Sequence, residues 1–104
     1  MRYVVGYTPT DRGADAVALA SALARAQGAQ LDLVYVVDRK TPYVALHPEG
    51  SGVSAAEQEM LTAEREGLSL IPKDVEAKFH VRHADSHAAG LIDAALDYEA
   101  GLIV

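Results

Sequence analysis

The chain begins with a strand, a helix and a second strand in close succession, and this order limits the folds open to it. A nearly continuous apolar run predicts a strand over residues 2–7. An alanine-rich stretch predicts a helix over 14–27, and Gly28 can take the left-handed conformation that ends a helix. Residues 31–37 predict the second strand. A helix that joins two neighbouring strands makes them parallel, with a right-handed crossover.

A segment rich in proline and glycine follows the second predicted strand. Residues 38–53 are too broken for a strand and too long for an ordinary connection, so they predict a flexible surface loop. Residues 54–57 read Ser-Ala-Ala-Glu, the spacing of a capping box. A second helix is therefore predicted from this point to about Leu70, with Pro72 stopping it.

The last third of the chain repeats the alternation of strand and helix. Residues 75–82 alternate apolar and polar side chains, which predicts a third strand with one solvated face at the edge of the sheet. A third helix is predicted after Ser86, with Gly101 as its cap, before a fourth strand at 102–104. The sequence thus predicts one α/β domain over 1–104, an open, parallel, doubly wound sheet with helices on both faces.

Apolar spacing also predicts which face of each helix is buried. The predicted buried residues are Ala16, Leu19, Ala20 and Leu23 in the first helix, and Ala88, Leu91, Ile92 and Ala95 in the third.

Composition excludes several classes of function. Nine Lys and Arg against fifteen Asp and Glu give a formal charge of −6, which argues against a nucleic-acid partner. The chain has no cysteine, so it needs no oxidising compartment and a cytoplasmic location is expected. No segment has the length and apolar character of a membrane span, since the longest weakly polar run, 14–26, is mostly alanine.

The loop after the first strand lacks the glycine patterns of nucleotide enzymes. Residues 8–13 read Thr-Pro-Thr-Asp-Arg-Gly, which matches neither a dinucleotide fingerprint nor a P-loop. The chain also lacks the G-x-S-x-G of a hydrolase nucleophile elbow. A flavodoxin-like flavin site would rest on the hydroxyls of Thr8 and Thr10 alone.

Three histidines and an aspartate lie close together in the sequence, at His80, His83, Asp85 and His87. Imidazole and carboxylate groups are metal ligands, but this spacing spreads them over a strand, its end and the first turn of a helix. We interpret the histidines as solvated surface side chains, with metal binding as the less favoured alternative. Asp85 and Ser86 are predicted to cap the third helix, and a cap can also contact a ligand.

Two stretches of the chain together resemble universal stress protein domains. The residues Val4–Thr10, followed by Ala16 and Ala20 and then by Leu31–Asp38, resemble the start of such a domain. The segment 83–95 with 101–104 resembles the later G-D-x-x-x-x-I-x-x-A-A … D-L-I-V pattern of the family. In that pattern Ala84 replaces the glycine and Gly101 replaces the second aspartate.

The resemblance implies a sheet of order 3-2-1-4-5 and a ligand site between strands one and four, where some members of the family bind ATP. The fifth strand and a glycine-rich phosphate loop would follow Val104, where the sequence stops, so we expect an incomplete domain. Carried over position by position, the Asp-Gly-Ser of the binders falls on Thr8, Pro9 and Thr10, and the strand position that meets adenine falls on Val36. Asp85 completes the set of candidate ligand residues.

The family resemblance favours a non-enzymatic stress-response domain that binds a small ligand or a partner protein. Because Thr8 has no carboxylate, binding of ATP or another adenine nucleotide is expected to be weak or absent. Universal stress proteins commonly form homodimers, and a homodimer is expected. The alternative is an adenylate-forming enzyme of the related α-hydrolase group, which would need a phosphate-binding loop at residues 8–13, where there is a single glycine.

Overall fold

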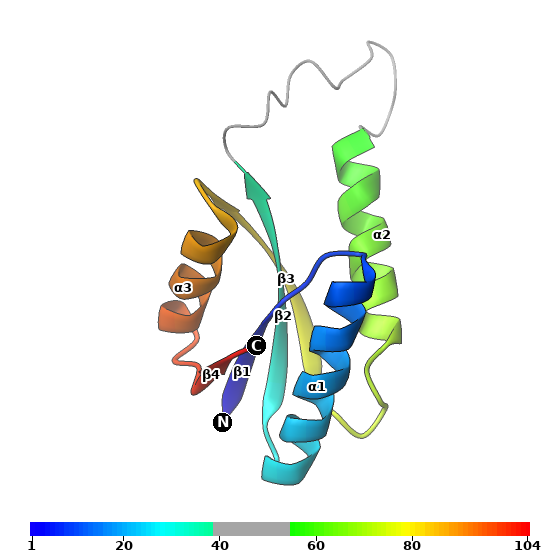
Figure 1. Cartoon of the computed structure of the whole chain (residues 1–104), viewed down its shortest axis with the longest axis vertical. Helices are drawn as coiled ribbons and strands as arrows, with labels where there is room; N and C mark the ends of the chain where they lie inside the picture. The colour runs from blue at the N-terminus through cyan, green and yellow to red at the C-terminus, as the bar shows by residue number, and fades with distance from the viewer. Residues whose placement is uncertain (39–54) are drawn as a thin grey trace.

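A computed structural model of the chain describes residues 1–38 and 55–104. Four strands alternate with three helices (Figure 1). In chain order the elements are β1 (Arg2–Gly6), α1 (Asp11–Gln27), β2 (Gln30–Asp38), α2 (Ala55–Ser69), β3 (Ala77–Ala84), α3 (His87–Asp97) and β4 (Leu102–Ile103). Asp38 therefore belongs to β2, whereas the rest of the predicted surface loop and the serine of the predicted capping box lie outside the described residues.

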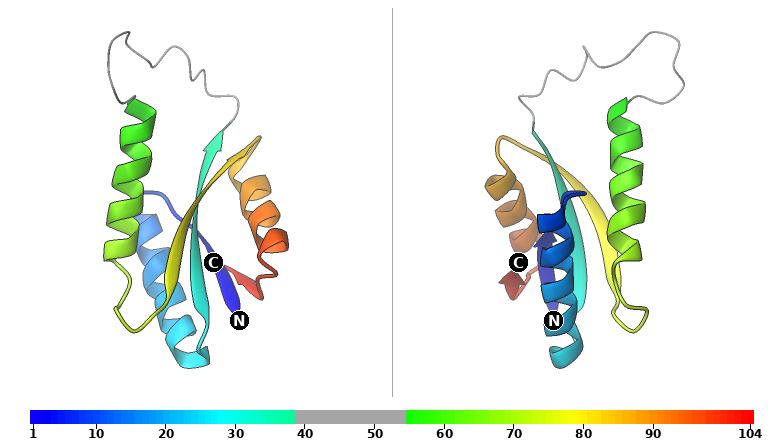
Figure 2. Two further views of the ribbon diagram at one scale, coloured as in Figure 1. Left: turned by 180° about the vertical axis from the view of Figure 1, so that it is seen from behind. Right: turned by 45° about the vertical axis from the view of Figure 1, so that its right-hand side comes forward.

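The strands form one parallel sheet in the order β3-β2-β1-β4. The predicted doubly wound α/β fold, with β1 inside the sheet and β3 at its edge, is confirmed. Helices α1 and α2 cover one face of the sheet and α3 covers the other (Figures 1 and 2). The direction of the chain therefore brings the carboxyl ends of all the strands to one edge of the domain.

The core has two apolar layers because successive side chains of a strand point to opposite faces. On the α1 and α2 face the layer includes Tyr3, Val5, Leu31, Leu33, Val17 and Ala63. On the α3 face a smaller layer is built from Val4, Val34 and Ala94. Alternate residues of β1 and β2 thus pack in different layers. A given strand residue can therefore reach a bound ligand from only one face of the sheet.

The predicted buried face of α1 is partly wrong. The structure buries Gly13, Val17, Ala20 and Ala24, whereas Leu19 is 56% exposed. Most positions of this helix are alanine or polar, so apolar spacing sets its rotation weakly. Small residues and the β-branched Val17 allow a closer approach to the sheet than the longer leucine would, and close packing decides the rotation.

The predicted buried face of α3 is corrected in the same way. Ile92 is 53% exposed and Ala88 is also exposed, while Gly90 and Ala94 are buried. A Cβ added to Gly90 would lie 2.7 Å from both Cγ atoms of Val36. The glycine therefore lets α3 sit directly on β2, and this contact selects the buried face.

Of the predicted helix caps, Gly28 and Ser86 are confirmed, whereas Asp85 and Gly101 are wrong, since Ser86 alone is the N-cap of α3. Gly28 ends α1 in the left-handed conformation, with φ of 67°. Gly101 does not cap α3, because the helix ends at Asp97 and Tyr98 is the C-cap. The left-handed residue there is Glu99, with φ of 53°. Within the described residues, no helix is long and apolar enough to cross a membrane.

Candidate functional site

The strand order reverses direction at β1, which has β2 on one side and β4 on the other. The paired residues of β1 and β2 end at Gly6 and Val34, but β2 continues to Asp38. On the other side, the Val104 carbonyl accepts a hydrogen bond of 3.2 Å from the Gly6 amide. Parallel sheets bind ligands outside the carboxyl ends of their strands at such a switch point. The end of β1 is therefore the candidate site.

A tight loop connects β1 to α1 at this point. Thr10 is the N-cap of the helix, and its Oγ1 accepts a hydrogen bond from the Gly13 amide at 3.3 Å. The Thr10 amide donates to the Thr8 carbonyl at 2.8 Å, and the two threonine Oγ1 atoms lie 3.0 Å apart. Asp11, Arg12 and Gly13, predicted as loop residues, form the first turn of α1. The two exposed hydroxyls thus stand beside the positive end of a helix dipole.

Gly13 is required for this loop geometry. A Cβ added to Gly13 would lie 1.9 Å from the carbonyl oxygen of Thr8, a separation that neither backbone segment can accommodate without moving. The first turn of α1 therefore rests directly on the loop. Any side chain at this position would displace Thr8 and its hydrogen bond to Thr10.

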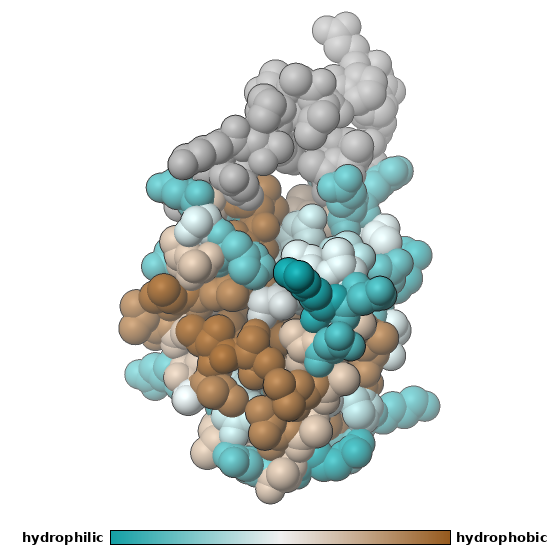
Figure 3. Space-filling model, viewed as in Figure 1, coloured by the Kyte–Doolittle hydropathy of each residue, from teal (hydrophilic) through white to brown (hydrophobic). Residues whose placement is uncertain are grey.

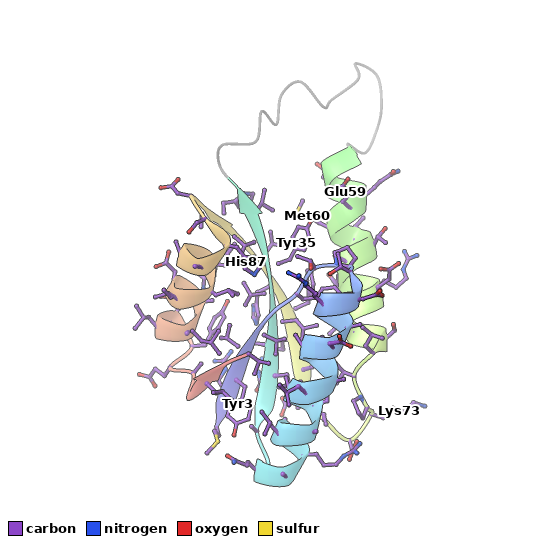
Figure 4. All side chains as sticks on the ribbon, viewed as in Figure 1. Tyr3, Tyr35, Glu59, Met60, Lys73 and His87 are labelled. Atoms are coloured by element: carbon purple, nitrogen blue, oxygen red, sulfur yellow. The ribbon has the colours of Figure 1, made fainter. Side chains whose placement is uncertain are left out.

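On the α3 face of the sheet, His87 lies over the end of β1 (Figure 4). A Cβ added to Gly6 would lie 3.0 Å from Nε2 of His87 and 2.8 Å from Cδ1 of Leu91. Ser86 is the N-cap of α3, and its Oγ accepts from the Ala89 amide at 3.1 Å. His87 is exposed, as predicted for a surface side chain, but the sequence did not predict that its ring lies over Gly6. The only signals available were its position in the first turn of the helix and the glycine at the end of β1.

The structure brings together three of the five predicted ligand residues. Thr8, Pro9 and Thr10 form the loop itself. The side chain of Val36 packs on Gly90, so contact between Val36 and a ligand would come from its backbone. Asp85 is exposed and follows β3, which β2 separates from β1.

Two hollows open beside the same loop, between it and α2. The Tyr35 hollow, about 570 Å³, is lined by Pro9, Tyr35, Gln58, Glu59 and Thr62. The Tyr7 hollow, about 300 Å³, has Tyr7, Pro9, Thr10, Asp11, Glu66 and Ser69 among its lining residues. Pro9 contributes to both. Figure 4 shows Tyr35 and Glu59 near this end of the sheet.

The comparisons with known proteins agree with this architecture. The model of the universal stress protein family matches residues 1–104. The chain belongs to the universal stress protein family. A search of curated proteins finds no match.

Two solved structures of universal stress proteins are similar in fold. One, from Archaeoglobus fulgidus, has a TM-score of 0.72 and 20% identity, over 99% of this chain and 72% of the other. The second is a universal stress protein in complex with cAMP, with a TM-score of 0.65 and 16% identity, over 99% of this chain and 69% of the other.

This universal stress protein domain also contains a buried ion pair on the α3 face of the sheet. Asp32 of β2 is fully buried, and the Arg2 guanidinium donates two hydrogen bonds of 2.8 Å to its carboxylate. His80 Nε2 lies 2.8 Å from Oδ1 of the same carboxylate. Burial alone raises the pKa of Asp32, but the hydrogen bonds from Arg2 and His80 outweigh it and hold that pKa below its ordinary value.

The interpretation of His80 as a solvated surface side chain is therefore wrong. Its ring contacts Asp32 and lies 4.6 Å, centroid to centroid, from the ring of Tyr98. The side chain of His80 is only 23% exposed. His80 thus faces a buried carboxylate while His87 lies over Gly6, and no group of three or more metal-ligating side chains converges in the described part of the chain.

Proposed function

We propose that this universal stress protein domain is a non-catalytic module that binds a small anionic ligand at the switch point. The observation that carries the proposal is the loop Thr8–Thr10, which Gly13 holds against the N-terminus of α1 beside the end of β1. Exposed hydroxyls and the positive end of a helix dipole favour phosphate oxygens. His87, on the opposite face, can add a further hydrogen bond to the same ligand.

The ligand class that we propose is the adenine nucleotides, bound weakly. The structure of a family member with cAMP supports the class. In the proposed complex Thr8 faces the sugar hydroxyls, from which a carboxylate at that position could accept hydrogen bonds. Thr10 and the N-terminus of α1 face the phosphate, and the backbone of Val36 contacts the base. Weak affinity follows from Thr8, which stands where the family's nucleotide binders have an aspartate. A hydrogen bond to a charged group contributes about 1.5–3 kcal/mol, so its loss lowers affinity at least tenfold.

The non-catalytic part of the proposal rests on the partners of the two hydroxyls. The Oγ1 atoms of Thr8 and Thr10 face each other at 3.0 Å, and Thr10 also caps α1. A nucleophilic hydroxyl needs a general base within hydrogen-bond reach. Here the neighbour of each hydroxyl is the other hydroxyl, which is not a general base. The arrangement therefore suits ligand binding rather than nucleophilic attack.

Calorimetric titration with ATP, AMP and cAMP tests the proposal. We expect weak, saturable binding, weaker still in Thr8→Val, and stronger binding in Thr8→Asp, which restores the family's carboxylate. Glu64→Gln, an exposed position on α2 that lines neither hollow beside the loop, is the control and should bind as the wild type does. Unchanged affinity in both Thr8 variants would exclude this site. Pyrophosphate release from ATP in the presence of candidate carboxylic acids would support the adenylate-forming alternative and end the non-catalytic proposal.

We also propose that the domain acts as a cytoplasmic homodimer. Four large apolar side chains are exposed on α3 and β4, where Figure 3 shows apolar surface. They are Ile92, Leu96, Leu102 and Ile103, each 40% exposed or more. A second copy of the chain would bury them. Light scattering should give a dimer mass that Leu96→Glu reduces to the monomer mass, while Leu61→Glu on α2 leaves it unchanged.

A further inference from the structure

The Tyr7 and Tyr35 hollows carry negative charge that the proposed nucleotide site does not use. Asp11 and Glu66 line the first, and Glu59 lines the second. Among the described residues that line either hollow there is no lysine, arginine or histidine. A concave surface with charge of one sign raises the local concentration of ions of the opposite sign. The ligand that fits these hollows is therefore a cation.

A second observation is the hydroxyl of Tyr7. Tyr7 is 2% exposed, and its ring lies against α2, since a Cβ added to Gly67 would be 3.1 Å from Cε2 of Tyr7. The hydroxyl has no hydrogen-bond partner within residues 1–38 and 55–104, yet Tyr7 lines the hollow. The phenol oxygen is therefore available to accept a hydrogen bond from a ligand.

The pKa values of Tyr7 and Tyr35 are consistent with a cation in these two hollows. Burial, and then the charge of Glu66, raise the pKa of Tyr7. Burial, and then the charge of Glu59, raise the pKa of Tyr35. Each glutamate therefore acts on the tyrosine of its own hollow, and both phenols stay neutral near pH 7. A neutral phenol beside a carboxylate suits an ammonium group, and the face of the Tyr35 ring can attract a second one.

The carboxylates line two different hollows, which favours an organic cation with separated charges over a metal ion. No group of three or more potential metal ligands converges in the described part of the chain. Charges that lie apart suit a ligand whose own charges lie apart. Pro9 lines both hollows, whose volumes are about 300 and 570 Å³. A flexible aliphatic chain with an ammonium group at each end could therefore cross Pro9 and occupy both.

We propose that the Tyr7 and Tyr35 hollows form a binding site for a linear aliphatic polyamine. One ammonium group lies in the Tyr7 hollow, between Glu66 and Asp11, and donates to the Tyr7 hydroxyl. The other lies in the Tyr35 hollow, beside Glu59. The hollows share Pro9 and Thr10 with the proposed nucleotide site. Their charged groups, Asp11, Glu59 and Glu66, are not ligand residues of that site, so the polyamine proposal does not rest on the proposed function.

The test is calorimetric titration of the whole chain with spermidine, at low salt and at about 0.15 M NaCl. We expect saturable binding at both salt concentrations. Glu66→Gln should weaken it about tenfold, the effect of losing one charge-assisted hydrogen bond, and Tyr7→Phe should weaken it by a smaller factor. Glu64→Gln is the matched control, because Glu64 is an exposed acid of the same helix that lines neither hollow. It should bind as the wild type does.

Three results would overturn the proposal. They are the absence of saturable binding, equal weakening in Glu64→Gln and Glu66→Gln, or displacement of spermidine by an equal concentration of Mg²⁺. The last two would show attraction to the acidic surface as a whole. Thermal melting of each variant checks that it is folded. A parallel titration with ATP separates the two proposals, since failure of nucleotide binding leaves the spermidine result unaffected.

Discussion

Replacing Asp32 by asparagine tests how much the buried ion pair stabilises the domain. Asp32 is fully buried, and its carboxylate accepts two hydrogen bonds of 2.8 Å from Arg2 and contacts His80. Asparagine has nearly the same shape but one oxygen and one NH₂ group. Each carboxylate oxygen accepts one hydrogen bond from Arg2. The NH₂ group would therefore face an Arg2 donor in either orientation of the amide, and Arg2 would lose one of its two acceptors.

The expected cost follows from burial. Removing one partner of a buried ion pair costs about 3–5 kcal/mol. The Arg2 side chain is 35% exposed and can recover some hydration, so we expect Asp32→Asn to lower the free energy of unfolding by about 2–4 kcal/mol. For a domain of this size, each 1 kcal/mol lowers the melting temperature by about 4–8 °C.

Asp74 supplies a matched control. It accepts two hydrogen bonds of 2.8 Å from Arg25, the same geometry as the Arg2 pair, but the two side chains are 57% and 59% exposed. Asp74→Asn should therefore melt close to the wild type. Urea unfolding followed by circular dichroism gives both free energies. Equal destabilisation by the two variants would refute the argument that burial gives the Asp32 pair its energy.

Three further predictions concern acid stability and two structural positions. Because the pKa of Asp32 is held below its ordinary 3.8, its stabilisation is present above that pH and is lost as the pH falls below about 4; acid unfolding should therefore show a smaller pH dependence in Asp32→Asn. Gly13→Ala should destabilise the domain by about 1–3 kcal/mol despite the better helix propensity of alanine, because its Cβ would meet the Thr8 carbonyl at 1.9 Å. Gly101→Ala, whose Cβ would lie 4.0 Å from its nearest neighbour, is the control in the same urea titration. Ser86→Ala should cost about 1 kcal/mol through the lost N-cap of α3, whereas Asp85→Ala should leave the melting temperature unchanged, since Asp85 is not the cap; the opposite order would assign the cap to Asp85.

Much of the fold could be predicted because the relevant signals are local. The apolar run of β1, the alternation along β3 and the left-handed Gly28 each express a preference of the backbone within a few residues. The order of these elements then leaves few topologies, since crossovers between parallel strands are right-handed. The family resemblance supplied the strand order 3-2-1-4, and the structure agrees with it.

The buried faces of α1 and α3 could be predicted only in part. Leu19 and Ile92 have the apolar character of core residues but are more than half exposed. Gly13 and Gly90, which carry no apolar side chain, are buried. Sequence periodicity detects the spacing of apolar side chains, whereas packing favours the face that brings the helix close to the sheet. The two criteria select different faces where a helix contains many small residues.

The sequence by itself determined the elements, their order and the position of the loop after β1, because these depend on local backbone preference and on chain direction. Tertiary structure alone decided what surrounds them. The contact between Asp32 and His80 spans 48 residues of sequence and that between Asp32 and Arg2 spans 30. The approach of His87 to Gly6 likewise requires the register of the sheet and the seating of α3. Such contacts form only when the strands pair and the helices pack on the sheet. A sequence pattern within a single helix or strand therefore cannot predict these contacts.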